Sequence, residues 1–413
     1  MIALGYGAAA KTLFSQENSA KQSLALPRTL GAEETLARSS RLMKALSISR
    51  LADLTSLDRL GIPVYCAVTP LAADLTTHLG KGRDKSAAKA SALMEACERI
   101  CAEKLPEKPT RKTYEQMRAL EANVIDPQKL ALPADTEFTD TLPIDWALAT
   151  ELTSGAPIYV PADLVISPSQ DGVLRYPNTN GLAAGNTQLE AVLHGLCEVI
   201  ERDAAGRLLF ADLYSKDGDE VPVSQRLNLA SGVPETALKL IEEINTHGLS
   251  VEVELLTQDI QIPVCRVELI DPRFPTVNGP QMRRFPGLGC DLNAETALMR
   301  AITEAAQSRL AVIQGARDSY NYFPRRKLTS PPPARDPSEI SWADVPSFDS
   351  LDMREDLTYL LDMLNAAGLD QVLHVDLTHP CIDVPVVRVI VPGLSVFFVD
   401  QGRVSWRDLQ CLI

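Results

Sequence analysis

The sequence predicts an α+β fold, in which antiparallel strand pairs pack against long helices. Short runs rich in β-branched and aromatic residues come in pairs, at 144–152 with 158–161 and at 251–256 with 262–269. Long segments with helical periodicity interrupt these pairs in an irregular order. A doubly wound parallel sheet would alternate strand and helix regularly, so the pattern favours antiparallel sheets covered by helices.

The remaining elements follow from local patterns and from the residues that begin or end them. Asn186 is expected as the N-cap of a long helix, because its side-chain oxygen can accept an N–H group of the first turn. Gly248 is expected as the C′ residue that ends another helix. The expected helices are 33–45, 85–103, 114–122, 187–206, 234–246, 294–313 and 354–367, and the expected strands are 62–69, 144–152, 158–161, 251–256, 262–269 and 384–391.

A glycine-rich segment at 285–293 is expected to form a turn before the helix at 294–313. Gly287 and Gly289 allow two interpretations there. The favoured one is that they only make the turn. The alternative is that they let backbone N–H groups approach an anion at the start of the helix.

The chain has 413 residues, which is long enough for two or three domains. No change in composition divides it, so we expect one main domain at 25–400, preceded by an arm at 1–24 and followed by a C-terminal tail at 401–413. A proline-rich stretch at 327–347 is expected to be an irregular joint within that domain.

Composition and charge exclude several classes of protein. The sequence is 45% hydrophobic and 23% charged, as expected of a globular chain with a sizeable core, and its net charge of −14 argues against nucleic acid or an anionic membrane as partner. No apolar run is long enough to span a membrane, and the N-terminus lacks the features of a signal peptide. The eight cysteines include no CxxC pair and are expected to be buried thiols of a cytoplasmic protein.

The helix expected at 187–206 carries an unusual acidic stripe. At about 100° per residue, Glu190, His194, Glu198 and Glu201 fall within an arc of about 80°. The rest of this helix is apolar nearly all round, which is typical of a buried helix. Aligned carboxylates in such surroundings repel one another and are costly to desolvate, unless cations lie between them.

Two further helices carry similar stripes, and together they predict a shared polar centre. The helix at 85–103 presents two glutamates, and the helix at 294–313 presents one. Divalent cations such as Mg²⁺ take oxygen ligands from carboxylates and from substrate phosphates, and arginines in the same place can hold phosphate oxygens. No GxxxxGK[ST] occurs, so the sequence predicts a nucleotide and magnesium site without a P-loop. The carboxylates are Glu95, Glu98, Glu190, Glu198, Glu201 and Glu304, and the arginines are Arg99, Arg202 and Arg300.

The residues of these stripes resemble the nucleotide-binding motifs of the YcaO family. The motif Sx3ExxER stands here as Ser91, Glu95, Glu98 and Arg99. The second motif, an Asn followed by spaced glutamates, is matched by Asn186, Glu190, Glu198, Glu201 and Arg202, and the third by Arg300, Glu304 and Gln307. Two segments match more loosely, namely Gly80-Lys81-Gly82 and a pair formed by Arg28 and Thr35.

The resemblance covers roughly residues 25–400 and implies a YcaO-like catalytic domain with antiparallel sheets and long helices around a central nucleotide site. It implies ATP and Mg²⁺ as cofactors. The implied metal ligands are the six glutamates of the stripes. The implied ATP-binding residues are Ser91, Arg99, Asn186, Arg202, Arg300, Arg28, Thr35, Lys81 and Gln307; no general base is assigned.

Proteins similar to this one phosphorylate a backbone amide oxygen of a peptide and then replace it with a nucleophile. Azoline-forming members often end in a proline-rich tail, whereas this chain ends in SWRDLQCLI. The stretches 49–68 and 299–319 resemble the branch that is paired with a TfuA protein and forms thioamides. ATP-dependent thioamidation of a peptide or protein is therefore the leading hypothesis.

Partners and alternatives follow from the same resemblance. The 26 residues before Pro27 are too few for a leader-binding domain, so recognition of the substrate is expected to need a TfuA-type partner protein. A homodimer is compatible with the sequence. An azoline-forming cyclodehydratase and a non-catalytic nucleotide-binding assembly subunit stay open as alternatives, while a kinase-like or ATP-grasp-like enzyme is disfavoured by the missing phosphate loop.

Overall fold

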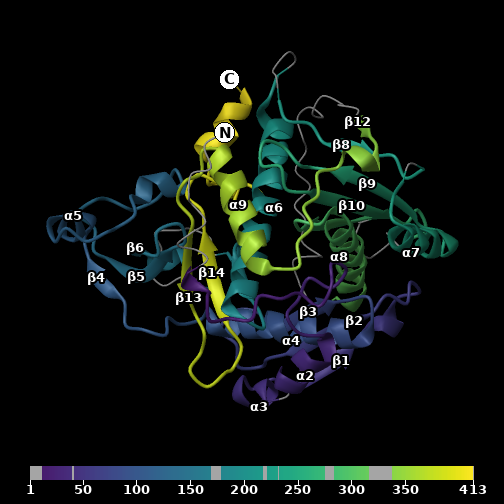
Figure 1. The fold of residues 1–413 in the computed structure, drawn as a ribbon, viewed down its shortest axis with the longest axis horizontal. Helices are drawn as coiled ribbons and strands as arrows, with labels where there is room; N and C mark the ends of the chain where they lie inside the picture. Colours follow the sequence, from purple (N-terminus) through teal and green to yellow (C-terminus); the bar gives the residue numbers. More distant parts are fainter. Residues whose placement is uncertain are drawn as a thin grey trace.

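The computed structural model describes residues 12–39, 41–168, 178–216, 221–230, 232–274, 283–315 and 337–412. In these ranges the chain forms three sheets of three, five and six strands, with nearly all strand pairs antiparallel. Long helices lie between the sheets and pack on them (Figure 1). The prediction of an α+β fold with antiparallel sheets is confirmed.

The three-stranded sheet follows the order β1-β2-β3, and helix α4 packs on β2 and β3. Its strands are β1 (Arg50–Asp53), β2 (Val64–Val68) and β3 (Thr77–Lys81), and the helices on this side are α2 (Ala32–Ser39), α3 (Leu42–Ala45) and α4 (Lys85–Cys101). The single helix expected at 33–45 is therefore two helices. Gly80 and Lys81, which the sequence left in a loop, lie in β3.

The six-stranded sheet follows the order β4-β5-β13-β14-β7, with β6 paired to β5. Its strands are β4 (Thr110–Lys112), β5 (Ile144–Glu151), β6 (Pro157–Pro161), β7 (Leu182–Ala184), β13 (Leu373–Asp376) and β14 (Val386–Ile390), and its helices are α5 (Tyr114–Ala119), α6 (Gln188–Tyr214) and α9 (Met353–Ala366). The long helix α6 runs through the middle of the molecule and packs on β14, β7 and α9 (Figure 1). Its apolar side chains belong to the largest part of the core.

The five-stranded sheet follows the order β11-β10-β9-β8-β12. Its strands are β8 (Gln225–Leu227), β9 (Ser250–Leu255), β10 (Val264–Ile270), β11 (Arg284–Cys290) and β12 (Ser338–Ile340), and its helices are α7 (Glu235–Thr246) and α8 (Ala294–Gln314). Two predictions are corrected here. The glycine-rich segment is strand β11 rather than a turn, and residues 338–340 of the expected proline-rich joint form β12; residues 327–336 of that joint lie outside the described residues.

Glycines in two strands allow helices to approach unusually closely. A Cβ added at Gly80 would lie 2.0 Å from the backbone nitrogen of Ala92 in α4. A Cβ added at Gly287 would lie 2.2 Å from the backbone nitrogen of Ala305 in α8. Neither contact is possible for a residue with a side chain, so glycine at these positions fixes the distance between strand and helix.

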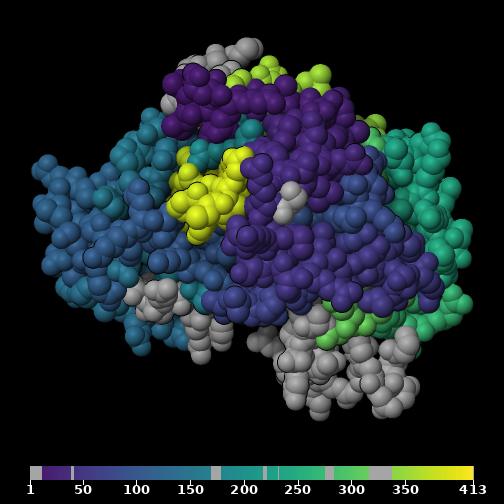
Figure 2. Space-filling model, turned by 90° about the horizontal axis from the view of Figure 1, so that it is seen from below, coloured from purple at the N-terminus to yellow at the C-terminus, as the bar shows by residue number. Residues whose placement is uncertain are grey.

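Both ends of the described chain pack against the body of the protein. Phe14 is 2% exposed, and the Arg354 guanidinium donates to its backbone oxygen. Figure 2 shows the N-terminal residues (purple) spread over one face beside a yellow patch from the C-terminal part of the chain. There Arg38 of α2 donates to the backbone oxygen of Asp383, 3.1 Å away in the connection between β13 and β14.

Two expectations about composition can be compared with the structure. Seven of the eight cysteines are buried and Cys381 is exposed, and burial raises the pKa of the Cys101 thiol to about 12. Among the described residues, no helix is both long and apolar enough to cross a bilayer.

Candidate functional site

Helices α4, α6 and α8 turn their polar stripes toward one cavity of about 590 Å³. Every residue that the sequence singled out for ATP or metal lines this cavity. They are Arg28, Thr35, Lys81, Ser91, Glu95, Glu98, Arg99, Asn186, Glu190, Glu198, Glu201, Arg202, Arg300, Glu304 and Gln307. The three stripes therefore meet in space, as the sequence predicted.

The N-terminal segment reaches across to the start of α6 and compensates Glu190. Arg28 Nη1 donates to Glu190 Oε1 at 3.1 Å, and Thr29 donates to Glu190 Oε2 through its backbone nitrogen and its hydroxyl, at 3.0 and 2.9 Å. Asn186 Nδ2 donates to Glu190 Oε1 at 3.0 Å, and its Oδ1 accepts from the hydroxyl of Thr35. Groups of the protein therefore satisfy both oxygens of Glu190.

The helix cap beside this cluster differs from the prediction by one residue. Thr187 is the N-cap of α6, because its hydroxyl accepts the backbone N–H of Glu190 at 3.1 Å. The Asn186 side chain is instead directed to Glu190 and to Thr35. Asn186 thus lines the cavity rather than capping the helix.

Lys81 connects β3 to the stripe of α8. Its ammonium group forms a hydrogen-bonded ion pair with Glu304, and Glu304 Oε1 also accepts the backbone N–H of Leu288 in β11 at 3.2 Å. Burial acts to raise the pKa of Glu304, but Lys81 and then Arg202 outweigh it, so the pKa is lowered. Glu304 is therefore an ionised carboxylate.

Glu95 and Glu98 of α4 are adjacent carboxyl groups whose pKa values are shifted in opposite directions. Glu95 accepts from Arg99 Nε at 3.0 Å, and this cation outweighs the effect of burial and lowers the pKa of Glu95. Glu98 accepts the backbone N–H of Ala184 at 2.8 Å, yet burial and the neighbouring Glu95 raise its pKa well above the usual value. As a result, Glu95 ionises more readily than Glu98.

Glu198 and Glu201 bring further negative charge from α6. Burial raises the pKa of Glu198 to about 7, partly offset by Arg202. Burial also raises the pKa of Glu201, whose nearest cation is Arg202 with its Nη2 at 3.6 Å. Among the described residues, no protein group donates a hydrogen bond to Glu198. This carboxylate consequently has the least compensation in the cavity.

Arg300 lines the cavity from α8, whereas the carboxylates just described come from α4 and α6. Its Nη1 donates to the backbone oxygen of Cys290 at 3.2 Å and to Asp291 at 3.3 Å. These two contacts occupy one nitrogen and fix the direction of the guanidinium. The remaining N–H groups can donate to a phosphate, which guanidinium groups bind in a bidentate manner.

The donor set suits Mg²⁺. Glu98 and Glu201 are buried and Glu198 is half-buried, and the pKa of each carboxyl is raised because the protein compensates its negative charge poorly. Within the described residues, no three acidic, histidine or cysteine side chains are grouped closely enough to form a complete metal site. Mg²⁺ typically binds through one or two carboxylates and completes its shell with phosphate oxygens and water, so an incomplete set of this kind matches its chemistry.

His194 lines the same cavity, although the sequence assigned it no role. It lies between Glu190 and Glu198 on the stripe of α6. That position in the sequence could have predicted that His194 lines the cavity. Its Nδ1 is buried with no hydrogen-bond partner. Burial, followed by the charges of Arg300 and Arg28, lowers its pKa well below 6.5, so the imidazole is neutral at pH 7.

The chain is similar in sequence to proteins of one family. The family model described as "YcaO cyclodehydratase, ATP-ad Mg2+-binding" matches residues 79–395. An uncharacterized protein of Methanothermobacter thermautotrophicus is 34% identical over 92% of this chain and 98% of its own length. A Rhizobium leguminosarum bv. trifolii protein, described as uncharacterized and in the tfuA 3′ region, is 35% identical over 86% of this chain and 85% of its own.

Solved structures agree with the sequence comparisons. The structure of YcaO from Methanopyrus kandleri bound with AMPPCP and Mg²⁺ has a TM-score of 0.70 and 28% identity, and the match covers 93% of this chain and 96% of that one. A heterocyclase in complex with substrate and cofactor has a TM-score of 0.71 at 24% identity, covering 92% of this chain and 54% of that one. The second match bears on the fold alone.

Proposed function

The chain belongs to the YcaO family, which is of ATP-dependent cyclodehydratase type, and from this premise we propose that it uses MgATP to activate a backbone amide of a peptide. The observation that carries the proposal is the cavity in which the stripes of α4, α6 and α8 meet. It combines poorly compensated carboxylates with several cationic side chains, among them Arg99, Arg202, Arg300 and Lys81. A metal ion needs negatively charged ligands and a triphosphate needs positively charged ones, and this cavity offers both.

We assign different tasks to the two kinds of side chain. Glu98, Glu198 and Glu201 would each offer carboxylate oxygens to Mg²⁺, one or two per ion, and phosphate oxygens and water would complete the shell. The metal supplies charge compensation for the phosphates when it is bound. Arg99, Arg202, Arg300 and Lys81 would hold and orient the phosphate oxygens. Ser91, Asn186, Thr35, Arg28 and Gln307 would contribute hydrogen bonds to the nucleotide around the rim of the cavity.

The proposed reaction has two steps. The amide oxygen attacks the γ-phosphorus of ATP and ADP leaves, which converts a poor leaving group into a phosphate. A sulfur nucleophile then attacks the amide carbon, and phosphate leaves with the original oxygen to give a thioamide. The walls of the cavity would exclude water, which would otherwise compete as the nucleophile.

We propose that the product is a thioamide, and two observations favour this product over an azoline. The relative from R. leguminosarum is named for its position beside tfuA, which accords with a TfuA-type partner. The stretches 49–68 and 299–319 resemble the branch that is paired with a TfuA protein and forms thioamides. The substrate would be a peptide or protein presented with the help of that partner.

Mass spectrometry of the product tests the proposed function. The protein, its TfuA-type partner, a candidate peptide, MgATP and sulfide are incubated together, with reactions lacking ATP or sulfide as controls. We expect a mass gain equal to the exchange of one oxygen for sulfur, dependent on both reagents. Loss of water would identify the azoline-forming alternative instead.

The non-catalytic alternative is tested by phosphate release. With the true substrate present, the wild-type protein should release phosphate much faster than Glu198→Ala. Equal rates would identify a nucleotide-binding assembly subunit that carries the fold without the chemistry.

A further inference from the structure

Arg202 has an aromatic neighbour that lies outside the three stripes. Its guanidinium carbon is 5.3 Å from the centre of the Phe398 ring, a distance at which the ring face attracts a cation. Within the described part of the chain, the guanidinium also forms a loose ion pair with Glu201, in which Nη2 and Oε1 are 3.6 Å apart. Phe398 is therefore a principal determinant of where the Arg202 side chain lies.

The segment that carries Phe398 is fixed to α6 directly beside Arg202. Asp203 Oδ1 accepts the backbone N–H of Ser395 at 2.7 Å. A Cβ added at Gly206, one turn further along α6, would lie 3.2 Å from the backbone nitrogen of Phe398. The backbone of residues 395–398 thus follows the surface of α6 closely and has little freedom to move away from Arg202.

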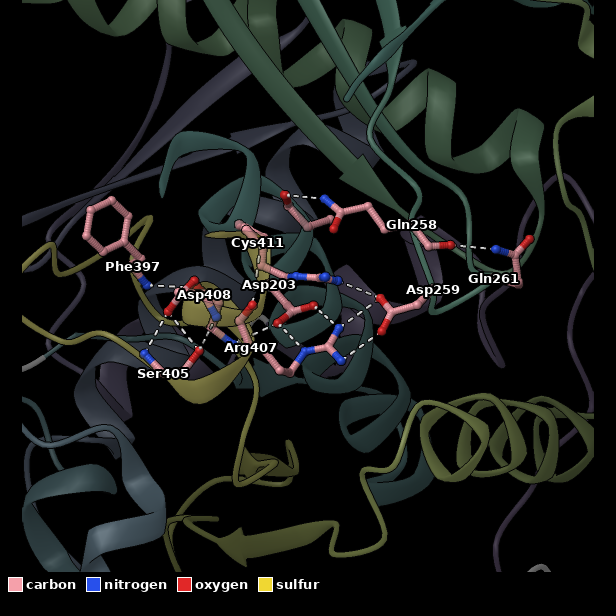
Figure 3. A network of polar contacts seen from close by, with 12 residues as sticks. Asp203, Gln258, Asp259, Gln261, Phe397, Ser405, Arg407, Asp408 and Cys411 are labelled. Atoms are coloured by element: carbon pink, nitrogen blue, oxygen red, sulfur yellow. Dashed lines mark hydrogen bonds and ion pairs between the residues drawn. The ribbon is translucent and has the colours of Figure 1, made fainter. Parts of the chain in front are cut away.

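An ion-pair network, buried at Asp203 and Arg407, holds the C-terminal segment in the same place (Figure 3). Arg407 lies in the short helix α10 (Trp406–Leu409), and its guanidinium is placed between Asp203 of α6 and Asp259 of the β9–β10 connection. It donates to Asp203 at 3.1 and 2.9 Å and to both oxygens of Asp259 at 2.9 Å. Arg207 adds a further bond to Asp259 at 2.6 Å.

The network joins three parts of the chain that are distant in sequence. Since Asp203 follows Arg202 directly, any movement of the C-terminal segment would be transmitted to the residue next to a cavity-lining arginine. Residues 395–412, much of which the sequence assigned to a tail, are instead packed as part of the body of the protein.

We infer that Phe398 is a positioning residue for Arg202, and that the C-terminal segment fixes this side of the nucleotide site. The inference rests on the proposed function, because it takes Arg202 as a phosphate-binding residue. Phe398 would act by holding the guanidinium over its ring so that the phosphates meet an already oriented donor. It would not touch the nucleotide itself.

Equilibrium binding of ATP in the presence of Mg²⁺ tests this inference with the full chain. Phe398→Leu keeps an apolar side chain but removes the aromatic face, so binding should weaken roughly two- to fivefold, the factor expected from a cation–π contact at a partly exposed site. Phe398→Tyr keeps the ring and should bind like the wild type. Phe398 is 41% exposed, so both variants should unfold close to the wild-type temperature.

Leu409→Ala is the matched control. Leu409 is also 41% exposed and lies in the same C-terminal segment, but it has no aromatic ring to place against a guanidinium. It should leave ATP binding unchanged. The inference is overturned if Phe398→Leu binds as tightly as the wild type, if Phe398→Tyr is weakened as much as Phe398→Leu, or if Leu409→Ala weakens binding equally. Failure of the wild type itself to bind MgATP would overturn the proposed function instead.

Discussion

In the β3–α4 unit Lys81 lies between Gly80 of the strand and Gly82 just beyond its end, and in the β11–α8 unit Leu288 lies between two glycines of the strand. Both strands meet their helices at the same kind of contact, with a glycine against the helix backbone. Both helices begin at a side-chain cap, Asp84 for α4 and Asn293 for α8. The middle residue of each glycine pair also donates its backbone N–H to the helix stripe, from Lys81 to Ser91 at 3.4 Å and from Leu288 to Glu304 at 3.2 Å.

The chemistry of the two units is nevertheless different. The stripe of α4 presents the adjacent carboxylates Glu95 and Glu98, while that of α8 presents Arg300 with a single carboxylate, Glu304. Lys81 extends from the first unit and pairs with Glu304 of the second. One backbone arrangement therefore carries both the proposed metal-binding side and the proposed phosphate-binding side, and the close strand–helix contact is the feature common to both.

The largest expected effect comes from disturbing that common contact. Gly80→Ala and Gly287→Ala each place a methyl group within 2.2 Å of helix backbone, so the helix must move. We expect each to lower the free energy of unfolding by about 3 kcal/mol, or to prevent folding. Urea titration measures this. In Gly31→Ala the new methyl would have its nearest neighbour at 3.6 Å, so this control should stay near wild-type stability. Equal losses of stability in all three variants would contradict the special role of the glycines that contact the helices.

The second prediction separates the chemistry of the two units. Arg300→Met should weaken ATP binding about tenfold, the loss expected for a charge-assisted hydrogen bond, while leaving the Mg²⁺ concentration required for binding unchanged. Glu98→Gln should raise the required Mg²⁺ concentration by a similar factor. Titrations of nucleotide at several Mg²⁺ concentrations measure both. If the two variants behave alike, the proposed division between metal and phosphate sides is wrong.

The third prediction concerns Glu198, which faces the carboxylates of the α4 side from α6. Its pKa is raised from 4.5 to about 7, so between these values the folded protein keeps a proton that the unfolded chain releases. The metal-free wild type should therefore lose stability as pH rises through this window. Glu198→Gln removes the loss and should be more stable than the wild type at pH 8 by about 1–3 kcal/mol, while matching it near pH 4.

Adding Mg²⁺ gives the complementary measurement. Only the ionised carboxylate binds the metal, so Mg²⁺ should stabilise the wild type more at pH 8 than at pH 5, and should stabilise Glu198→Gln less. The unfolding temperatures of both proteins, measured with and without Mg²⁺ at pH 5 and pH 8, test this. A variant that is less stable than the wild type at pH 8 without metal would show that Glu198 is compensated by the protein.

The smallest effect is expected at His194. Because this imidazole is neutral at pH 7, replacing it with neutral glutamine preserves the charge of the cavity. His194→Gln should change ATP binding by less than about threefold, the effect of one neutral hydrogen bond, and should leave its pH dependence between pH 6 and 8 unaltered. A pH profile that shifts in this variant would indicate that His194 carries a proton in the site.

The errors in the sequence analysis have identifiable physical causes. Gly287 and Gly289 were expected in a turn because glycine weakens strands, but here α8 lies against β11 and leaves no space for side chains. Asn186 was expected as a cap because its side chain is a good local acceptor. A hydroxyl from Thr35, 151 residues away, and the carboxylate of Glu190 occupy that side chain instead, and Thr187 takes the cap.

The sequence by itself determined which residues share a face of each helix, since the positions of Glu95 and Glu98 on α4, or of Glu198 and Glu201 on α6, depend only on the helical repeat. That was sufficient to predict the polar stripes and the family. Only the tertiary structure decided which cation meets which carboxylate, because Arg28, Lys81 and Arg407 reach partners that lie on other elements. The charge left uncompensated at Glu198 is therefore a property of the folded arrangement, in which each ion pair depends on how sheets and helices pack together.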